Sequence, residues 1–171
     1  MSDTASSCNI RALQSGDHAA VLAIYNDYVA YSTCTFDTTP FSLAARIPWF
    51  AQFQHPRRRC IVAHHADKLL GYACCVPLKD KPAYGRSVEV SIYTAREHQA
   101  QGVGSALYDH LFHDLETKTD LHRAYACITL PNDPSIALHE KFGFTHVGHF
   151  NEAGFKFGQY WDVAWYERAL I

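Results

Sequence analysis

A strand that runs through a two-glycine turn into a helix constrains this chain more than any other feature. The strand is the β-branched stretch 88–94 (VEVSIYT), the turn is 99–104 (QAQGVG), and an amphipathic run continues to Glu116. Apolar side chains recur every four residues in that run and predict one core-facing side of a helix: Val103, Leu107, Leu111 and Leu115, with Ala106 beside them. Glycines let backbone N–H groups approach an anion at a helix N-terminus, where the helix dipole adds attraction. The segment therefore predicts a phosphorylated ligand.

Two blocks of sequence together carry a resemblance to a known family. The turn matches Gln/Arg-x-x-Gly-x-Gly/Ala, and it lacks both the Lys-Ser/Thr of a P-loop and the glycine spacing of a dinucleotide fingerprint. The segment 130–144 matches Asn-x-x-Ser-x-x-Leu-(Tyr/His)-x-x-x-Gly-Phe, beginning at Asn132 and with His139 at the Tyr/His position. In this order and spacing, the blocks resemble the coenzyme site of the GCN5-related N-acetyltransferases (GNAT).

Further matches narrow the resemblance to one branch. Val-Glu-x-Ser-x-Tyr at 88–93, Thr35-Phe36, Pro-Ala-Tyr at 82–84 and Trp-Asp-Val at 161–163 look like the phosphinothricin and methionine sulfoximine acetyltransferases. The resemblance implies an acyltransferase that moves an acetyl group from acetyl-coenzyme A (acetyl-CoA) directly to the α-amino group of a small amino-acid analogue, and that forms a homodimer. Two alternatives stay open. The acceptor could be another primary amine (a polyamine, a peptide N-terminus or an aminoglycoside), or the protein could be a non-catalytic acetyl-CoA-binding sensor.

Length and composition set the broad class. At 171 residues the chain is expected to form a single N-acetyltransferase domain, 1–171, with its core at about 9–168. The resemblance implies an α/β (α+β) GNAT fold, with a mixed, mostly antiparallel central sheet of six to seven strands and helices on both faces. A hydrophobic share of 48%, a net charge of −2 and the absence of a long apolar run argue against disorder, nucleic-acid binding and membrane attachment. Without a secretion signal or a Cys-x-x-Cys pair, the chain is expected to be cytoplasmic.

Periodicity and turn residues predict the elements along the chain. The expected strands are 9–13, 60–65, 69–76, 88–94, 123–130, 145–150 and 160–167, and the expected helices follow the cap at 15–17, the two-glycine turn, and Asn132. Ser42 is a candidate helix cap, but Pro48 should break a helix begun there. We therefore expect Pro48 to be the first residue of a helix that runs through Trp49 to Phe53.

Glu89 is the candidate general base. Alternation along the strand puts Val88, Val90 and Ile92 on one face and Glu89, Ser91 and Tyr93 on the other. A carboxylate in an apolar strand either pairs with a cation such as Arg86 or performs chemistry, and the resemblance implies that it takes a proton from the acceptor ammonium. The freed amine would then attack the thioester carbonyl, with backbone N–H groups near Ile92 stabilising the oxyanion.

His139 occupies the position at which many relatives carry a tyrosine that protonates the leaving thiolate. Imidazole can supply a proton near neutral pH, so His139 is either the general acid or a helix-surface histidine that touches the coenzyme or nothing. By the same resemblance, the backbone and side chains that bind acetyl-CoA are Ile92, Tyr93, Thr94, Gln99, Ala100, Gln101, Gly102, Val103, Gly104, Ser105 and Asn132.

The acceptor side resembles the family less closely. Its candidates by position are Phe36, Lys79, Tyr84 and Arg86. Gly85 stands where an arginine is common, and Arg86, one residue later, should point to the other face of the strand. Lys79, Lys81 and Arg86 offer a basic rim that favours an anionic acceptor such as an amino-acid analogue.

The remaining patterns have simpler explanations. The eleven histidines include no His-Glu-x-x-His pattern, so we expect no metal. Arg57-Arg58-Arg59 is expected to be a solvated loop before a strand. The late aromatic residues between Phe155 and Tyr166 are expected to serve the core and a dimer contact.

Overall fold

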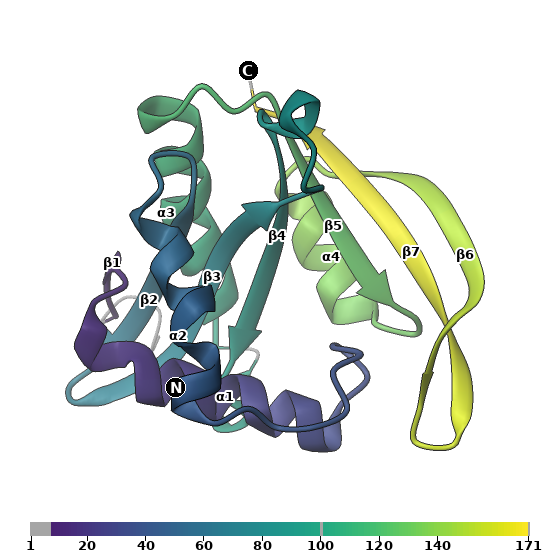
Figure 1. The fold of residues 1–171 in the computed structure, drawn as a ribbon, viewed down its shortest axis with the longest axis horizontal. Coiled ribbons are helices and arrows are strands. Elements are labelled where there is room, and N and C mark those ends of the chain that lie inside the picture. The colour runs from purple at the N-terminus through teal and green to yellow at the C-terminus, as the bar shows by residue number, and fades with distance from the viewer. Residues whose placement is uncertain (1–7, 100, 171) are drawn as a thin grey trace.

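A seven-stranded sheet forms the centre of the computed structural model, which describes residues 8–99 and 101–170 (Figure 1). The order is β1-β2-β3-β4-β5-β7-β6, and within it only β4 and β5 pair in parallel. The strands are β1 (Asn9–Ala12), β2 (Arg59–His65), β3 (Lys68–Pro77), β4 (Ser87–Thr94), β5 (Arg123–Thr129), β6 (Thr145–Lys156) and β7 (Gln159–Ala169). The expected mixed, mostly antiparallel sheet is confirmed.

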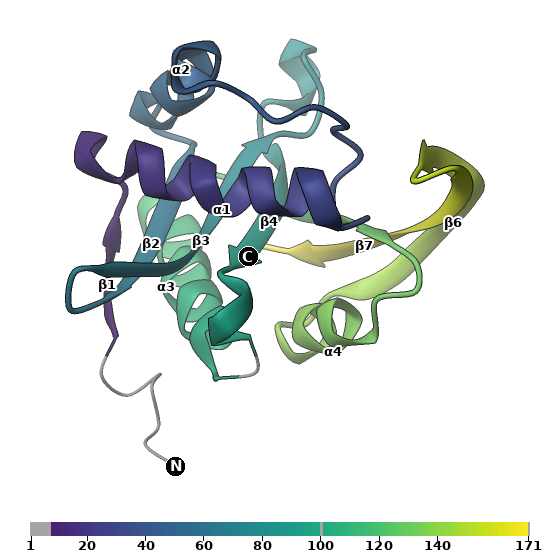
Figure 2. The same cartoon turned by 90° about the horizontal axis from the view of Figure 1, so that it is seen from below.

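Helices cover both faces of this sheet. Figure 2 shows α1 (His18–Tyr31) and α2 (Leu43–Ala51) on one side, and α3 (Val103–Lys118) and α4 (Asp133–Lys141) on the other. Short 3-10 turns complete the chain: η2 (Ser15–Asp17), η3 (Gln52–Gln54), η4 (Pro82–Tyr84) and η5 (Arg96–His98). The buried apolar residues form one cluster between the sheet and α3 and another between the sheet and α1 and α2.

The α1 and α3 predictions are confirmed in detail. The helix expected after the cap at 15–17 forms as α1 and buries one apolar face: Val21, Leu22, Tyr25, Tyr28 and Val29. The predicted every-fourth-residue series of α3 is buried, together with Tyr108 and Phe112. A carboxylate network fixes the start of α1, because the buried Asp17 accepts hydrogen bonds from both Arg11 guanidinium nitrogens and from the Gln14 N–H. Burial of a periodic apolar face is what a sequence predicts best.

The prediction for α2 was wrong, since the helix begins after Ser42 and contains Pro48 in its interior. The Ser42 side chain accepts the Ala45 N–H at 3.2 Å, and Phe50 is buried with its ring stacked on His18 at 4.0 Å. A proline inside a helix costs about 3 kcal/mol. An N-cap is worth about 1 kcal/mol and burial of a Phe side chain up to about 3 kcal/mol, so capping and packing together outweigh the proline.

The last two strands are longer than predicted. β6 and β7 continue to a tight turn at Phe157 and Gly158, whose φ angles of 54° and 78° suit a two-residue hairpin. Their register shifts between Phe150 and Gly154, where Glu152 has a φ of 51°. This irregularity interrupts the alternation that marks a strand in the sequence, so the predicted strand stopped at Phe150.

β4 and β5 separate after a short parallel pairing, and this separation creates the functional site. The paired positions are Ser87 with Arg123, Val88 with Ala124 and Glu89 with Tyr125. Beyond them the strands diverge, as Figure 1 shows. Among the described residues, the β4 segment 90–94 therefore has no strand partner on its β5 side.

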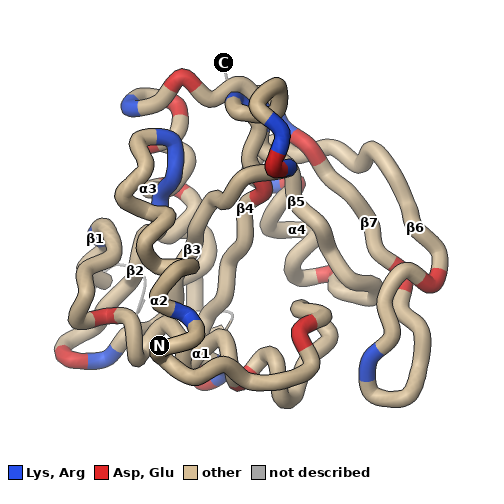
Figure 3. Tube along the Cα trace, in the orientation of Figure 1, with Lys and Arg blue, Asp and Glu red and all other residues tan. Residues whose placement is uncertain are grey.

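Charged residues of both signs are interspersed around the periphery, as Figure 3 shows. The Arg57–Arg59 cluster is tied to the C-terminal end of α3, with Arg57 paired to Asp120 at 2.5 Å and Arg59 to Asp114 at 3.9 Å. None of the helices in the described ranges has the length and apolar character needed to cross a membrane.

Candidate acetyl-coenzyme A and amine site

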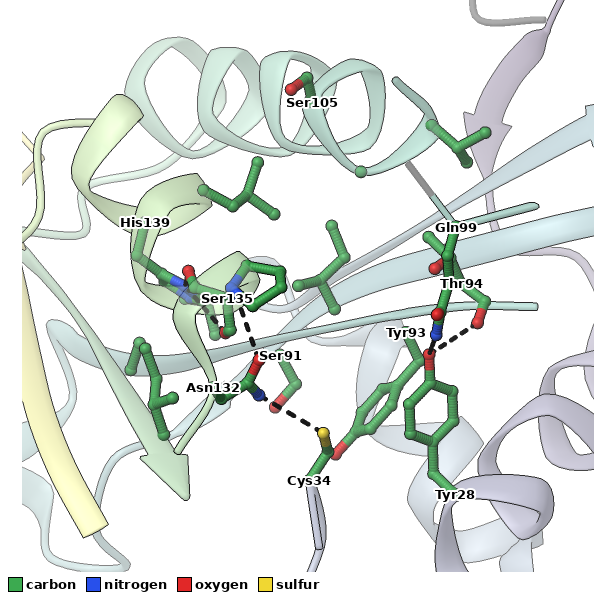
Figure 4. A pocket seen from close by; sticks show the side chains of 18 of the residues that line it. Tyr28, Cys34, Ser91, Tyr93, Thr94, Gln99, Ser105, Asn132, Ser135 and His139 are labelled. Carbon is green, nitrogen blue, oxygen red and sulfur yellow. Dashed lines mark hydrogen bonds between the residues drawn. The ribbon is translucent and has the colours of Figure 1, made fainter. Parts of the chain in front are cut away.

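A cavity of about 480 Å³ lies between the diverging ends of β4 and β5, and we call it the slot (Figure 4). The N-terminal turn of α3 and one side of α4 form further walls, and Tyr28 of α1 and Cys34 of the following loop lie opposite His139. Most of the predicted coenzyme residues line it: Ile92, Tyr93, Thr94, Gln99, Gly102, Val103, Gly104, Ser105 and Asn132. Gln101 does not line it, and Ala100 lies outside the described residues.

The two-glycine turn leaves the N-terminus of α3 open to a ligand. Gly102 has a φ of 78°, a left-handed conformation that favours glycine, and no side chain caps the helix. The first helical hydrogen bond runs from the Ala106 N–H to the Gly102 carbonyl at 3.1 Å. The N–H groups of residues 103–105 therefore have no partner within the helix. Together with the helix dipole they suit a diphosphate.

Tyr28 and Gln99 close one end of the slot. The Tyr28 hydroxyl donates to the Thr94 carbonyl at 2.8 Å and accepts from the Gln99 side chain at 3.1 Å. Across the slot, the Asn132 oxygen caps α4 by accepting the Ser135 N–H, and the Asn132 amide nitrogen lies 3.4 Å from the Cys34 sulfur (Figure 4). Residues from three segments that are far apart in sequence thus converge on one cavity.

Glu89 is half-buried on the face of β4 that also carries Ser91 and Tyr93, as predicted. Burial raises the pKa of its carboxyl group, and the nearby Lys79 ammonium partly opposes this. Among the described residues, none forms a hydrogen bond with the Glu89 carboxylate or an ion pair with it within 4 Å. The expected structural partner, Arg86, instead binds Asp120 at 3.3 Å. Glu89 does not line the slot itself, but Ser91, the next residue on its face, does.

His139 is buried, with 3% of its surface exposed, so the helix-surface alternative was wrong. Its Nδ1 lies 2.7 Å from the Ser135 carbonyl, which can only accept, so Nδ1 carries the proton. Its Nε2 then accepts from the Tyr108 hydroxyl at 2.8 Å. Burial lowers the pKa of His139, an effect partly offset by the hydrogen bond to Ser135. The ring therefore lines the slot as a neutral imidazole with both nitrogens engaged.

Of the four predicted acceptor residues, only Lys79 is shown to lie near the candidate base Glu89. Lys79 and Glu89 lie close enough to interact electrostatically. Phe36 lies in the loop after α1, and Tyr84 lies exposed in η4. Arg86 precedes β4 on the α3 side, is 67% exposed and is bound to Asp120, so the structure does not place it with Glu89. The ion pair with Asp120, just beyond the end of α3, accounts for this position.

Sequence reasoning missed several residues that line the slot, among them Tyr28, Cys34, Cys127 and Ser135. Tyr28 belongs to the buried face of α1, and neither cysteine lies in a motif that indicates a site. The Ser of the Asn-x-x-Ser block was the one available signal for Ser135. In the described parts of the chain, no cluster of three or more His, Cys, Asp or Glu residues could hold a metal ion.

Comparison with known proteins identifies the family. The model of the Acetyltransferase (GNAT) family matches residues 21–144, which is most of the chain and includes both β4 and the α3 turn. This chain belongs to the GNAT acetyltransferase family. The predicted fold and the expectation of an N-acetyltransferase enzyme are both confirmed.

Relatives of this GNAT acetyltransferase carry names that agree with the predicted branch. The phosphinothricin N-acetyltransferase of Streptomyces coelicolor is 48% identical over 152 residues, covering 86% of this chain and 87% of that protein. The L-methionine sulfoximine/L-methionine sulfone acetyltransferase of Pseudomonas aeruginosa is 32% identical, covering 96% and 95%. The structure of a phosphinothricin acetyltransferase from Sinorhizobium meliloti, solved in complex with acetyl-CoA, superposes with a TM-score of 0.90 at 28% identity, covering 95% and 88%.

Proposed function

We propose that this enzyme transfers the acetyl group of acetyl-CoA to the α-amino group of a small amino-acid analogue of the phosphinothricin or methionine sulfoximine kind. The proposal rests on β4, which carries the candidate base and also forms one wall of the coenzyme slot. β4 holds the unpartnered, desolvated carboxylate of Glu89 on one face, and its free edge at 90–94 opens onto a slot that ends at an uncapped helix N-terminus. A base and a coenzyme channel are thereby placed side by side.

The slot has the chemistry that acetyl-CoA requires. The N–H groups of residues 103–105 would bind the diphosphate, as helix N-termini bind phosphate groups. The open edge of β4 offers backbone hydrogen bonds along an extended ligand, and the pantetheine arm would lie there in the manner of an added strand. Asn132, on the opposite wall, would bind the amides of that arm.

Glu89 would act as the general base. An amino acid carries an ammonium group at neutral pH, and only the neutral amine can attack a thioester. A carboxylate with a raised pKa accepts that proton more readily than an ordinary one, and positioned general bases contribute roughly 10²–10⁴-fold. As the amine bonds to the carbonyl carbon, an N–H of the β4 edge near Ile92 would stabilise the oxygen, and the carbon–sulfur bond then breaks.

We propose that His139 serves the site by holding α4, and is not the general acid. Its Nε2 has no proton to give while it accepts from Tyr108, and burial disfavours the imidazolium. The need for an acid is also modest, because a thiol of ordinary pKa near 8.5 leaves as a thiolate far more readily than an alkoxide. By binding Ser135 and Tyr108, His139 joins the first turns of α4 to α3.

Lys79 is the cation that we propose for the acceptor carboxylate. It is exposed at the end of β3, and it is the one predicted acceptor cation placed near Glu89. An acceptor with an ammonium beside Glu89 and a carboxylate beside Lys79 matches both charges. A polyamine or aminoglycoside would place positive charge against Lys79, which is unfavourable.

We also propose that the enzyme is a cytoplasmic homodimer. The β6–β7 hairpin exposes four large aromatic side chains at more than half of their surface: Phe150, Phe155, Phe157 and Tyr160. Large exposed aromatic patches commonly mark protein interfaces. Cys34, Cys60, Cys74, Cys75 and Cys127 form no disulfide, which fits a reducing compartment.

The proposal is tested by acetyl-CoA-dependent thiol release with purified enzyme. The panel comprises phosphinothricin, methionine sulfoximine, methionine sulfone and ordinary amino acids, with spermidine and a peptide amine as controls. Methioninamide, which keeps the α-amine and lacks the carboxylate, tests the role of Lys79. Saturable turnover on the first group with poor use of the amide supports the proposal. Turnover on spermidine or the peptide alone would show that the acceptor is a different amine. Tight coenzyme binding without any turnover would favour the alternative of a non-catalytic acetyl-CoA sensor.

A further inference from the structure

Lys156 is a buried lysine far from Glu89 in the sequence. It lies near the tip of the β6–β7 hairpin, with 4% of its surface exposed. Its ammonium donates to the Ser32 carbonyl at 2.6 Å and to the Thr35 carbonyl at 2.7 Å, and lies 3.5 Å from the Tyr28 carbonyl. Burial lowers its pKa, while Asp37 opposes the shift. The three carbonyls account for every donor of the ammonium group.

These carbonyls belong to the end of α1 and to the segment that follows. The last carbonyls of a helix have no intrahelical partner and carry the negative end of the helix dipole, so a buried cation is favourable there. The segment 32–37, which we call the acceptor loop, leaves α1 at this point. Its backbone follows a path set by an ammonium group that comes from the opposite end of the chain.

The same hairpin also contacts the acceptor loop through close packing of Phe36 against Gly154. The Phe36 ring lies directly over Gly154, where an added Cβ would come within 2.2 Å of ring carbons. The Trp161 indole N–H donates to the Lys156 carbonyl at 2.9 Å and fixes the backbone that carries the ammonium. Figure 1 shows the hairpin tip beside the loop that follows α1.

The acceptor loop reaches the slot on the face of the sheet that carries Glu89. Cys34 lines the slot and lies against Asn132, as Figure 4 shows. Thr35 and Asp37 both hydrogen bond to the Tyr25 hydroxyl, and the Tyr25 ring packs edge-on against Tyr93 of β4. A shift of the loop would therefore move the wall that an acceptor meets beside Glu89.

We infer that Lys156 is a positioning residue for the acceptor: by holding the acceptor loop against the β6–β7 hairpin, it sets the affinity for the amine substrate. It touches neither substrate in the proposed reaction, and it acts through the loop backbone. This inference rests on the proposed function for its kinetic consequence only. The loop position itself can be measured in the absence of any acceptor.

The test compares Lys156→Met with Lys156→Arg and with the control Lys68→Met, a lysine at the exposed β2–β3 turn. Lys156→Met should raise the acceptor KM on the order of 10- to 100-fold, with a smaller change in kcat and in acetyl-CoA affinity. Lys156→Arg should recover part of the loss, because a guanidinium can still donate to the carbonyls. Lys68→Met should behave as wild type.

Two measurements do not depend on turnover. Hydrogen exchange of the amides of residues 32–37, and the rate at which an alkylating reagent labels Cys34, should both rise in Lys156→Met while the exchange of α3 stays unchanged. Gly154→Ala provides a second route to the same result, since its added methyl group displaces Phe36 with Lys156 intact.

Clear outcomes would overturn the inference. Wild-type KM together with wild-type exchange of the loop in Lys156→Met and Gly154→Ala would do so. Equal loss of acceptor and coenzyme binding with faster exchange throughout the molecule would also do so, since it would make Lys156 a stability residue only. If the wild-type enzyme acetylates none of the amines tested, the proposed function fails, while the exchange and labelling results still decide whether Lys156 holds the loop.

Discussion

Glu89 owes its expected reactivity to its surroundings. The carboxylate is partly withdrawn from water, no described residue within hydrogen-bonding distance satisfies it, and a single lysine lies near enough to stabilise its charge. Desolvation disfavours the charged form and raises the pKa, which brings a glutamate closer to the operating pH of a base. The same group, paired with Arg86, would have been a structural ion.

The pH dependence of kcat/KM tests this role. A base works when deprotonated, so activity should fall on the acid side as pH drops through the pKa of Glu89. Because that pKa is raised, the fall should begin at higher pH than for an ordinary glutamate near 4.3. Glu89→Gln should lower kcat/KM at neutral pH by roughly 10²–10⁴-fold, remove the acid limb and leave acetyl-CoA affinity nearly unchanged. An unchanged rate in this variant would exclude Glu89 as the base.

His139→Phe should separate a structural histidine from a catalytic one. The substitution leaves the Ser135 carbonyl and the Tyr108 hydroxyl without their partner, at a cost of about 1–3 kcal/mol for each buried group. The melting temperature should fall by several degrees, while kcat at a temperature where the protein is folded should stay within a few-fold of wild type. A large loss of kcat with an unaltered melting temperature would instead assign the proton transfer to His139.

Residue-scale prediction succeeded where one strand or one motif contained the signal. Alternation along β4 placed Glu89 and Ser91 together, and the Asn-x-x-Ser block placed Asn132 at the slot. It failed where the partner came from elsewhere: Arg86 pairs with Asp120, and Lys156 donates to backbone carbonyls of Ser32 and Thr35, just after α1. No local pattern encodes a hydrogen bond across more than a hundred residues.

At the scale of elements, we expect the start of α3 to bind an anion because competing groups are absent there. Gly102 supplies a left-handed turn without a Cβ, no capping side chain occupies the first N–H groups, and no acidic residue lies in the first turn. Gly104 packs within 3.4 Å of Leu138 and 3.6 Å of Ile92 at the position of its missing Cβ, which brings the helix end close to α4 and β4. The helix dipole is thus directed at the slot without competition.

A pair of substitutions at Gly102 separates the effect of charge on acetyl-CoA affinity from the effect of side-chain size. Gly102→Asp places a negative charge where a diphosphate is expected and should weaken acetyl-CoA binding by roughly 100-fold, or about 2.7 kcal/mol. Gly102→Asn has nearly the same shape, tolerates a left-handed φ and is neutral, so it should bind much more tightly than the aspartate variant. Isothermal calorimetry decides, and equal affinities for the two variants would contradict an anion at this turn.

Elements with one dominant signal were predictable, and those with opposing signals were not. In α2, the proline that breaks helices is opposed by a serine cap and a buried phenylalanine, and only the assembled core reveals which is stronger. In β6, the register shift after Phe150 conceals a strand that continues to Lys156. Both errors fell outside the strand, turn and helix of residues 88–116, where the predicted strand and helix match β4 and α3 closely.

For the whole molecule, the separation of β4 from β5 determines where chemistry can occur. A fully paired sheet would have no cavity at its centre, and the backbone groups of residues 90–94 would be satisfied by a neighbour. The separation leaves an edge in the middle of the sheet, bordered by helices on both faces (Figure 2). The sequence predicts both strands but contains no sign that their pairing ends at Glu89, because that depends on how all the layers pack.

For the whole molecule, the two sides of the β6–β7 hairpin differ, since one side contacts the acceptor loop and the other exposes aromatic rings. Phe155 and Tyr160 pair across the strands with ring centroids 5.0 Å apart, and both are exposed. If this surface joins two copies, Phe155→Glu should convert a dimer to a monomer in light scattering coupled to size-exclusion chromatography. Leu43→Glu, an equivalent change on the exposed surface of α2, should leave the dimer intact.

The monomeric variant also shows whether the two sides of the hairpin are coupled. Phe155 and Lys156 are neighbours that point to opposite faces, so a surface change at Phe155 need not disturb the ammonium. A Phe155→Glu monomer with a normal acceptor KM would mean that each chain holds its own acceptor loop. A monomer with the raised KM of Lys156→Met would mean that dimerisation is needed to keep the hairpin, and therefore the acceptor loop, in place. A Phe155→Glu variant that stays dimeric would remove the hairpin as the interface.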